Sequence, residues 1–362
     1  MFNPSRLALA RRRRGMTKIR LAEAVGLTPR SITGFETSRD IEPSPQTIEA
    51  LGRALGFPPE FFHGDDLVEP LKESASFRAL TSMTASERDA ALAAGAIAFQ
   101  LATWIGERFE LPPATMPDVR GSSPEAGAAA LRTLWGLGEQ PVGNMVHLLE
   151  SKGVRVFSLT HECKEVDAFS VWRAEVPFVF LNTMKLGERG RFDAAHELGH
   201  LVLHHSGGFD SRTAEVEADR FASAFLMSQG SMLALDARNP RLDQLTKLRK
   251  RWKVSTIALT HRLHALGMIT DWHYRHLCIE ISKRGLRSSE PDGIPRETSQ
   301  VLDKVFAALR QEGVTKTDVA RELHLYPADL DAIVFGLMIS AVEGGGTGGS
   351  RGRRQRPNLR IV

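Results

Sequence analysis

The sequence predicts an α+β protein that is mostly α-helical. Apolar residues recur three and four positions apart, the helical spacing, through most of the 362 residues. Strand-like alternation is found in three short segments between residues 153 and 181. Proline and glycine cluster at 112–124, and a Gly-rich, then Arg-rich tail begins at Gly344. We therefore expect several small helical units arranged around one three-stranded sheet.

The N-terminal unit, residues 1–65, is expected to contain four to five short helices. A basic segment at its start ends in four consecutive arginines, Arg11 to Arg14. Thr17 and Thr28 stand where a side chain caps the next helix, and Gly26 stands where a left-handed residue closes one. Short helices joined by a tight glycine turn are typical of a helix-turn-helix domain. We expect these helices at 5–14, 18–25, 29–37 and 46–55.

Residues 14–36, RGMTKIRLAEAVGLTPRSITGFE, resemble the lambda-repressor-like, XRE-type DNA-binding domains, and the resemblance extends over residues 5 to about 62. It implies a recognition helix at 28–37 that lies against double-stranded DNA. The arginines at 11–14 would meet phosphates, or else form a solvated basic surface. A lysine replaces a glutamine that is common in the family, so we expect the DNA contact there to be altered. The residues placed on DNA are Lys18, Thr28, Arg30, Ser31 and Thr33.

Residues 72–120 are expected to form a helical linker. The segment from Ser82 to Glu110 is rich in alanine and carries apolar residues at helical spacing. It could join two units or form the surface of a homodimer. The breakers at 112–124 end this part of the chain, and a new helix is expected from Ser123 to Leu137.

Three strands are expected before the most informative motif of the chain. They are predicted at 153–159, 167–172 and 176–181. Pro177 indicates that the last strand begins there or lies at an edge of the sheet. An edge strand beside a metal cleft could hold an extended peptide by main-chain pairing, or could be plain scaffold.

The motif is His196-Glu197-Leu198-Gly199-His200. Residues four apart share one face of a helix, so both imidazoles can face one metal ion, and Glu197 can take a proton from water beside it. Gly199 between them weakens a helix and suggests close backbone packing. His204 and His205 follow, either capping the helix end or acting as extra ligands.

A third metal ligand is expected on a second helix, around residues 213–226. Its apolar stripe contains small alanines that would allow it to approach the first helix closely. Glu215 and Asp219 are four apart and share a face, so one could ligate the metal while the other orients a histidine. Glu217 is a rival ligand, and helical geometry alone separates it weakly from Glu215.

Residues 193–204, DAAHELGHLVLH, and 215–228, EVEADRFASAFLMS, resemble the ImmA/IrrE-type metallopeptidases over roughly 125–285. The resemblance implies a gluzincin-like peptidase domain, at 123–230, with Zn²⁺ as its metal. It makes Glu215 the third ligand beside His196 and His200, Asp219 a support for a ligand histidine, and Glu197 the catalytic base. Manganese or iron would fit the same ligand set.

Beyond residue 230 the sequence becomes helical again. We expect a helical extension at 231–290, whose second half resembles another small helix-turn-helix, and a small helical unit at 295–343. The basic tail, 344–362, is expected to be disordered.

Composition limits the possible environments of the protein. The net charge is +4, and the two cysteines, Cys163 and Cys278, are far apart, which argues against a disulfide framework. No signal peptide or membrane-spanning run is evident, so we expect a cytoplasmic protein with no membrane partner.

Two functional hypotheses follow. The first is a DNA-binding regulator whose zinc-dependent peptidase domain cleaves a regulatory protein, such as a repressor, in a stress or mobile-element response. The second is a transcription factor or antitoxin-like regulator in which the zinc fold is a non-catalytic sensor or partner-binding module. Both imply double-stranded DNA and a regulatory protein as partners. Glu197 separates them, since only catalysis requires it.

Overall fold

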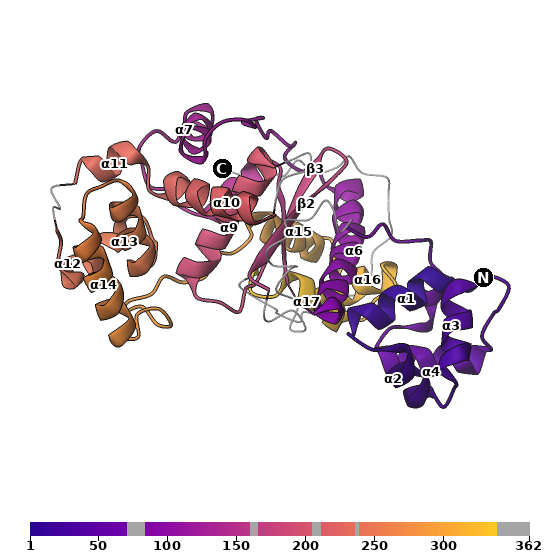
Figure 1. The fold of residues 1–362 in the computed structure, drawn as a ribbon. Coiled ribbons are helices and arrows are strands. Elements are labelled where there is room, and N and C mark those ends of the chain that lie inside the picture. Colours follow the sequence, from indigo (N-terminus) through magenta and orange to yellow (C-terminus); the bar gives the residue numbers. More distant parts are fainter. Residues whose placement is uncertain (71–83, 160–165, 205–210, 236–238, 339–362) are drawn as a thin grey trace.

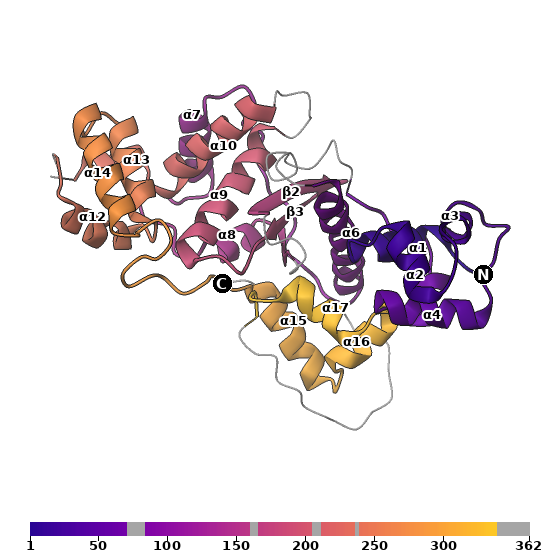
Figure 2. The ribbon, with the colours of Figure 1, turned by 60° about the horizontal axis from the view of Figure 1, so that its bottom comes forward.

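The computed structural model shows one small sheet within a mostly helical chain, which confirms the predicted α+β class (Figure 1). The N-terminal helices lie at one end of the molecule, helices α12 to α14 lie at the other, and the sheet lies between them (Figures 1 and 2). The residues that the structure describes are 1–70, 84–159, 166–204, 211–235 and 239–338.

The N-terminal unit folds as its capping residues predict. Thr17, Thr28 and Ser44 each accept a hydrogen bond from the backbone N–H three residues later. Gly26 and Gly56 close two helices with left-handed φ values of 68° and 64°. The elements are α1 (Pro4–Arg13), α2 (Lys18–Val25), α3 (Pro29–Thr37), α4 (Pro45–Leu55) and the 3₁₀ helix η1 (Pro59–His63).

The sheet has the order β1-β3-β2, with β1 (Arg155–Ser158) parallel and β2 (Ala168–Arg173) antiparallel to the central strand β3 (Val176–Leu181). The edge placement suggested for the strand of Pro177 is therefore wrong. Pro177 is the second residue of β3 and precedes the first residue paired with β1, Phe178, so its missing N–H costs the ladder little. The expected start of the strand at this point agrees with the structure.

Helices cover both faces of the sheet. On one face, α6 (Ala85–Arg108) packs through Phe99, whose ring centroid lies 4.5 Å from that of Phe178. The other face carries Ser170, paired in register with Val179, and it meets α9 (Gly187–Leu203). The metal-motif helix is thus seated on the sheet.

Helix α6 is long and apolar enough to cross a membrane by length and composition, but most of it is buried inside the protein. Buried residues occur all round it, as in the central helix of a core. It packs against α1 as well as the sheet, so most of its apolar surface is used within the chain, where the helix joins the two units.

Helix α10 (Ser211–Leu226) packs between α9 and α7 (Pro124–Leu134). Helix α8 (Met145–Ser151) leads into β1, and α11 (Gln229–Leu233) follows α10. The helical extension then contains α12 (Leu242–Leu248), η4 (Arg249–Arg251), α13 (Thr256–Ala265) and α14 (Asp271–Lys283).

The last described helices, α15 (Gln300–Gln311), α16 (Lys316–Glu322) and α17 (Pro327–Val334), connect the other parts of the molecule. Helix α15 contacts α8 and α17 contacts β1, while Trp104 of α6 donates a hydrogen bond to Glu322 over 2.9 Å. The same unit reaches α1, because Asp329 accepts two hydrogen bonds from Arg14. The tail predicted to be disordered lies outside the described residues.

Candidate metal centre and DNA-binding surface

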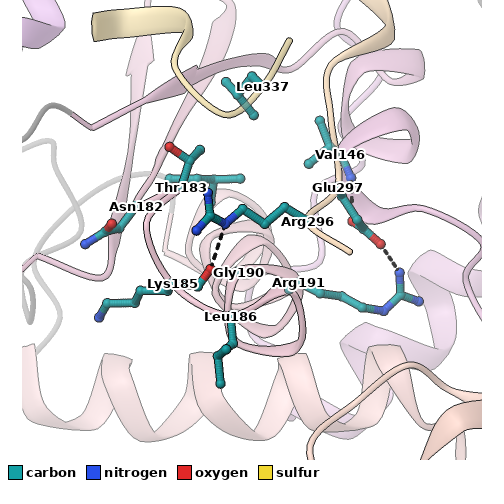
Figure 3. A pocket seen from close by; sticks show the side chains of 12 residues that line it. Val146, Asn182, Thr183, Lys185, Leu186, Gly190, Arg191, Arg296, Glu297 and Leu337 are labelled. Atoms are coloured by element: carbon teal, nitrogen blue, oxygen red, sulfur yellow. Dashed lines mark hydrogen bonds and ion pairs between the residues drawn. The ribbon is translucent and has the colours of Figure 1, made fainter. Parts of the chain in front are cut away.

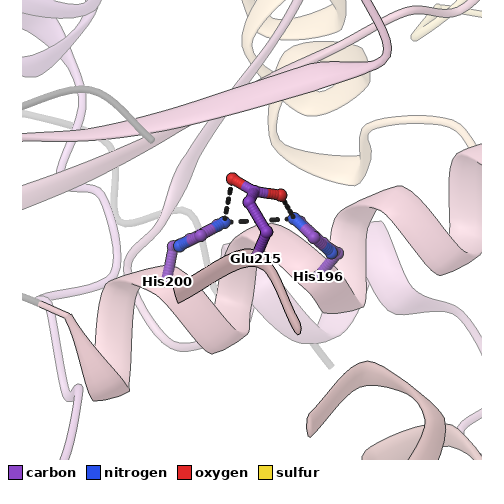
Figure 4. Close-up of side chains that lie close together, drawn as sticks. All are labelled: His196, His200 and Glu215. Atoms are coloured by element: carbon purple, nitrogen blue, oxygen red, sulfur yellow. Dashed lines mark hydrogen bonds and ion pairs between the residues drawn. The ribbon is translucent and has the colours of Figure 1, made fainter. Parts of the chain in front are cut away.

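Three side chains converge between α9 and α10. His196 and His200 lie one turn apart on α9, and Glu215 of α10 lies between them (Figure 4). The two Nε2 atoms are 3.1 Å apart. One carboxylate oxygen of Glu215 lies 3.2 Å from Nε2 of His196, and the other lies 3.3 Å from Nε2 of His200. The structure therefore brings the three predicted ligands together.

The donor set fits a zinc ion, since two imidazoles with one carboxylate are a donor set of zinc enzymes. Each imidazole faces a different oxygen of Glu215, and one ligand atom from each of the three residues lies within 4.8 Å of the other two. His200 and Glu215 are also buried, so the ligand positions are held by the protein interior.

Gly199 allows α10 to approach α9. A Cβ at this position would lie 3.0 Å from Cδ1 of Phe221 and 3.3 Å from Cα of Ala218. A larger residue here would move α10 and the carboxylate of Glu215 with it. The close packing expected from a glycine inside the motif is confirmed.

His196 is oriented by a carboxylate outside the donor cluster. Its Nδ1 lies 2.9 Å from Oδ1 of Asp219, the contact expected of a residue that supports a ligand. Burial lowers the pKa of His196, but its hydrogen bonds to Asp219 and Glu215 outweigh burial and raise this pKa to about 10. Burial raises the pKa of Glu215, but the hydrogen bonds from His196 and His200 bring it well below its usual range. Without a metal ion, a proton on His196 thus balances the negative charge of the carboxylates at this cluster.

His200 is held differently. Its Nδ1 lies 3.1 Å from Nδ1 of His204, and Nε2 of His204 lies 2.9 Å from Oε2 of Glu217. Glu217, the rival ligand, therefore contacts His204, and the donor cluster contains Glu215. His204 is the C-cap residue of α9, which agrees with the expectation that it caps the end of this helix. His205 lies outside the described residues.

Glu197 is buried beside the cluster, with 3% of its surface exposed. Ser170 of β2 donates a hydrogen bond over 2.7 Å to Oε2 of Glu197. This contact joins the carboxylate of Glu197 on α9 to the sheet. Ser170 cannot be predicted from local sequence, because the contact joins a strand to a helix that begins 17 residues later.

A second hollow lies at the start of α9, lined by Lys185, Arg191, Arg296 and Glu297 (Figure 3). Its charged side chains form hydrogen bonds and ion pairs with neighbouring groups. Arg191 donates to Glu297 and to the carbonyl of Val142, and Arg296 donates to two backbone carbonyls. We interpret this hollow as the seam that anchors α9 to α8 and to the segment before α15.

The expected DNA-contacting residues lie on or beside α3. Thr28, Arg30 and Thr33 are exposed, while Ser31 is half-buried and hydrogen-bonded to the cap residue Thr28. Lys18 is half-buried, with its Nζ 3.4 Å from Oε2 of Glu36. The exposed face of α3 is thus open on the described surface, while Lys18 already has an acidic neighbour.

The arginine run has a structural role that neither of the two expectations for it had included. Arg11 pairs with Glu36 over 2.5 Å, and Arg12 pairs with Glu69 over 2.6 Å. Arg13 is buried, with 1% of its surface exposed. Arg14 lies on the ring of Phe57 and pairs with a distant carboxylate, Asp329, over 2.7 Å. The guanidinium groups join α1 to other parts of the fold.

Two family models match the chain. Residues 149–264 match Peptidase M78, described as the IrrE N-terminal-like domain, and residues 5–61 match a helix-turn-helix domain. The first match contains the sheet and the helices of the candidate metal centre, and the second contains α1 to α4. No curated protein matches the chain. The fusion of the two domains that the sequence resembles is confirmed.

Proposed function

We propose that this chain, which joins a helix-turn-helix domain to an IrrE N-terminal-like domain, is a DNA-binding regulator that hydrolyses a peptide bond in another regulatory protein. A repressor that controls a stress or mobile-element response is the kind of substrate we favour. The observation that carries the proposal is the convergence of His196, His200 and Glu215 beside the buried carboxylate of Glu197. This is the set of groups that zinc-dependent peptide hydrolysis needs.

In this proposal, the ligands and Glu197 have separate roles in peptide hydrolysis. His196, His200 and Glu215 would hold the zinc ion, with Asp219 supporting the first histidine. When bound, zinc would polarise the scissile carbonyl and make water more acidic. Glu197 accepts a proton from the attacking water and passes it to the leaving amide nitrogen. The hydrogen bond from Ser170 restrains this carboxylate.

The position of β2 supports an extended peptide as substrate. Strand β2 is an edge strand of the described sheet and packs against α9, which carries the motif. A peptide that adds to such an edge is held by main-chain hydrogen bonds, which align it without regard to its sequence. The peptide-binding role that we considered for the strand of Pro177 is therefore assigned to β2.

The N-terminal domain supplies the second half of the function. We assign double-stranded DNA contacts to Thr28, Arg30, Ser31 and Thr33 on α3, with a minor contribution from Lys18 because Glu36 lies beside it. Such a protein would act in the cytoplasm, where its DNA target and its protein substrate are found together.

The test compares the wild type with Glu197→Gln, His200→Ala and Glu215→Ala. We expect about one zinc per chain in the wild type and in Glu197→Gln, and loss of zinc in the other two. To find a candidate substrate, new N-termini are mapped in a cell extract. Those that form with the wild type and do not form with Glu197→Gln mark the substrate. Proteolysis that survives Glu197→Gln, or regulation that this change leaves intact, would replace the proposal by a non-catalytic zinc sensor.

A further inference from the structure

The two histidines of the candidate metal centre are oriented by different means. His196 has a carboxylate, Asp219, at its Nδ1. His200 has a second imidazole at its Nδ1, that of His204, and a carboxylate follows only beyond that ring, at Glu217. A chain of three groups therefore runs outward from the cluster.

The chemistry of these groups determines where the protons lie. A carboxylate only accepts hydrogen bonds, so Nε2 of His204 must donate to Glu217. A neutral imidazole that carries its proton on Nε2 has a bare Nδ1, which must accept from Nδ1 of His200 over 3.1 Å. His200 therefore carries a proton on Nδ1, and Nε2 is the nitrogen left to bind the metal; without the metal, the proton on Nε2 is donated to Glu215 and is released when the metal binds. Nε2 of His200 is the atom that faces Nε2 of His196 and Oε1 of Glu215.

The two helices place these groups by their regular spacing. His200 and His204 are one turn apart at the end of α9, so their rings lie on one face, with centroids 5.2 Å apart and planes tilted by 53°. Glu217 follows Glu215 by two residues on α10, which directs the two carboxylates to neighbouring but different histidines. His204 is buried, with 7% of its side chain exposed, while 37% of Glu217 is exposed. The chain thus leads from the cluster to the protein surface.

We propose that His204 and Glu217 are positioning residues, which fix the tautomer of His200 so that its Nε2 lone pair faces the metal. The inference rests on the proposed zinc site and gives a role to two residues that the ligand set omits. Removal of a hydrogen-bond partner of this kind lowers metal affinity about 10- to 100-fold. Neither residue touches the substrate in this scheme.

The first measurement is the zinc dissociation constant, by competition with a chromogenic chelator. We expect Glu217→Ala and His204→Ala to weaken zinc binding about 10- to 100-fold. Glu217→Gln should bind nearly as the wild type does, because its amide oxygen still accepts from His204. Since Glu217 acts through His204, the double variant should bind no more weakly than His204→Ala. Val216→Ala, an exposed position on the same helix, is the matched control.

The second measurement reports the tautomers directly in the metal-free protein. Long-range proton–nitrogen NMR correlations of the imidazoles should show a proton on Nδ1 of His200, and should show His204 with its proton on Nε2 and a bare Nδ1. In Glu217→Ala this assignment should be lost, while circular dichroism shows the fold intact. This readout does not depend on peptidase activity.

The outcomes separate the two proposals. A wild type that binds zinc tightly, with Glu217→Ala within twofold of it, would overturn the positioning role and leave the proposed function standing. A glutamine variant as weak as the alanine variant would also overturn it, because charge and not the acceptor would then matter. A wild type that binds no zinc would overturn both.

Discussion

At the scale of single residues, the surroundings of a guanidinium group decide its role. Arg13 and Arg30 are both arginines of the N-terminal domain, but Arg13 is buried against the fold and Arg30 is exposed on α3. A buried arginine whose partner is lost leaves an uncompensated charge, which is costly. An exposed arginine on a recognition helix can donate to guanine or to a phosphate. Sequence shows four basic residues in a row, but the carboxylates that neutralise them come from distant segments.

We expect Arg30→Ala to weaken DNA binding about tenfold, since one good contact to a base is worth roughly 1–3 kcal/mol. The probe is a duplex selected by the wild-type protein from a random pool, and the affinity is measured by fluorescence anisotropy at a fixed salt concentration. The melting temperature should not change, because Arg30 is exposed.

Arg53→Ala is the matched control for this experiment, since Arg53 is an exposed arginine of the same domain on α4. If both variants bind DNA as tightly as the wild type does, the assignment of α3 as the recognition helix is wrong. If both weaken binding equally, general basic charge and not α3 determines the affinity.

At the scale of the elements, the candidate metal centre depends on how closely two helices approach. Glu215 reaches the histidines of α9 because glycine and alanine stand at the contact, where a Cβ on Gly199 would lie 3.0 Å from Phe221. Protein interiors are close-packed, so such a contact has little room to relax. The geometry of the ligands is thus a consequence of the packing of α9 on α10.

We expect Gly199→Val to separate the two helices and to lower zinc affinity together with stability. Overpacking a well-packed contact costs roughly 1–3 kcal/mol, which outweighs the small gain from replacing glycine inside a helix. The measurements are the urea midpoint and the zinc dissociation constant. Gly190→Val, on the same helix, is the control, because a Cβ there meets no atom within 4 Å. Equal zinc affinity in both variants would show that the approach of α10 does not set the site.

The elements also show how far the sequence reaches. Helix limits in the N-terminal domain follow from local signals, such as Thr28 and Gly26, and the sequence predicts them closely. The pair of histidines follows from helical spacing. The third ligand does not, since Glu215 and Glu217 differ only in the tertiary packing of α10, and the family resemblance was needed to choose. Strand order and the contact of Ser170 with Glu197 arise between distant segments and leave no local pattern.

At the scale of the whole molecule, carboxylates from distant segments cap helices and so join the parts of the chain. Glu150 of α8 accepts from the backbone N–H groups that begin α15, and Glu297 accepts from those that begin α8. Glu290 does the same at the start of α13. A carboxylate at a helix N-terminus satisfies donors that the helix cannot. The helix starts carry local caps as well, so sequence predicts the helices but not these connections.

The last prediction concerns the connection made by Glu150, which is buried with 2% of its surface exposed. Burial raises the pKa of Glu150 to about 7, although the hydrogen bonds from Ser299, Val301 and Gln300 oppose this. The pKa in the folded state therefore lies above the unfolded value of 4.5. The stability that goes with the bound proton is fully present below pH 4.5 and is lost as the pH rises through 7.

We therefore expect the wild type to lose about 3 kcal/mol of unfolding free energy relative to Glu150→Gln between pH 4.5 and 7. The glutamine stays neutral and keeps an oxygen that accepts from α15, so it removes the titration and retains the cap. Urea titrations at several pH values, followed by circular dichroism, measure the difference. Glu139→Gln is the control of opposite sign, because a hydrogen bond from Ser228 lowers the pKa of Glu139. Its stabilisation is present above the unfolded pKa and is lost as the pH falls through the folded pKa, so it adds only a small slope of opposite sign at the acid end of this window. A flat difference for Glu150→Gln would show that burial does not raise the pKa of Glu150 in the folded protein.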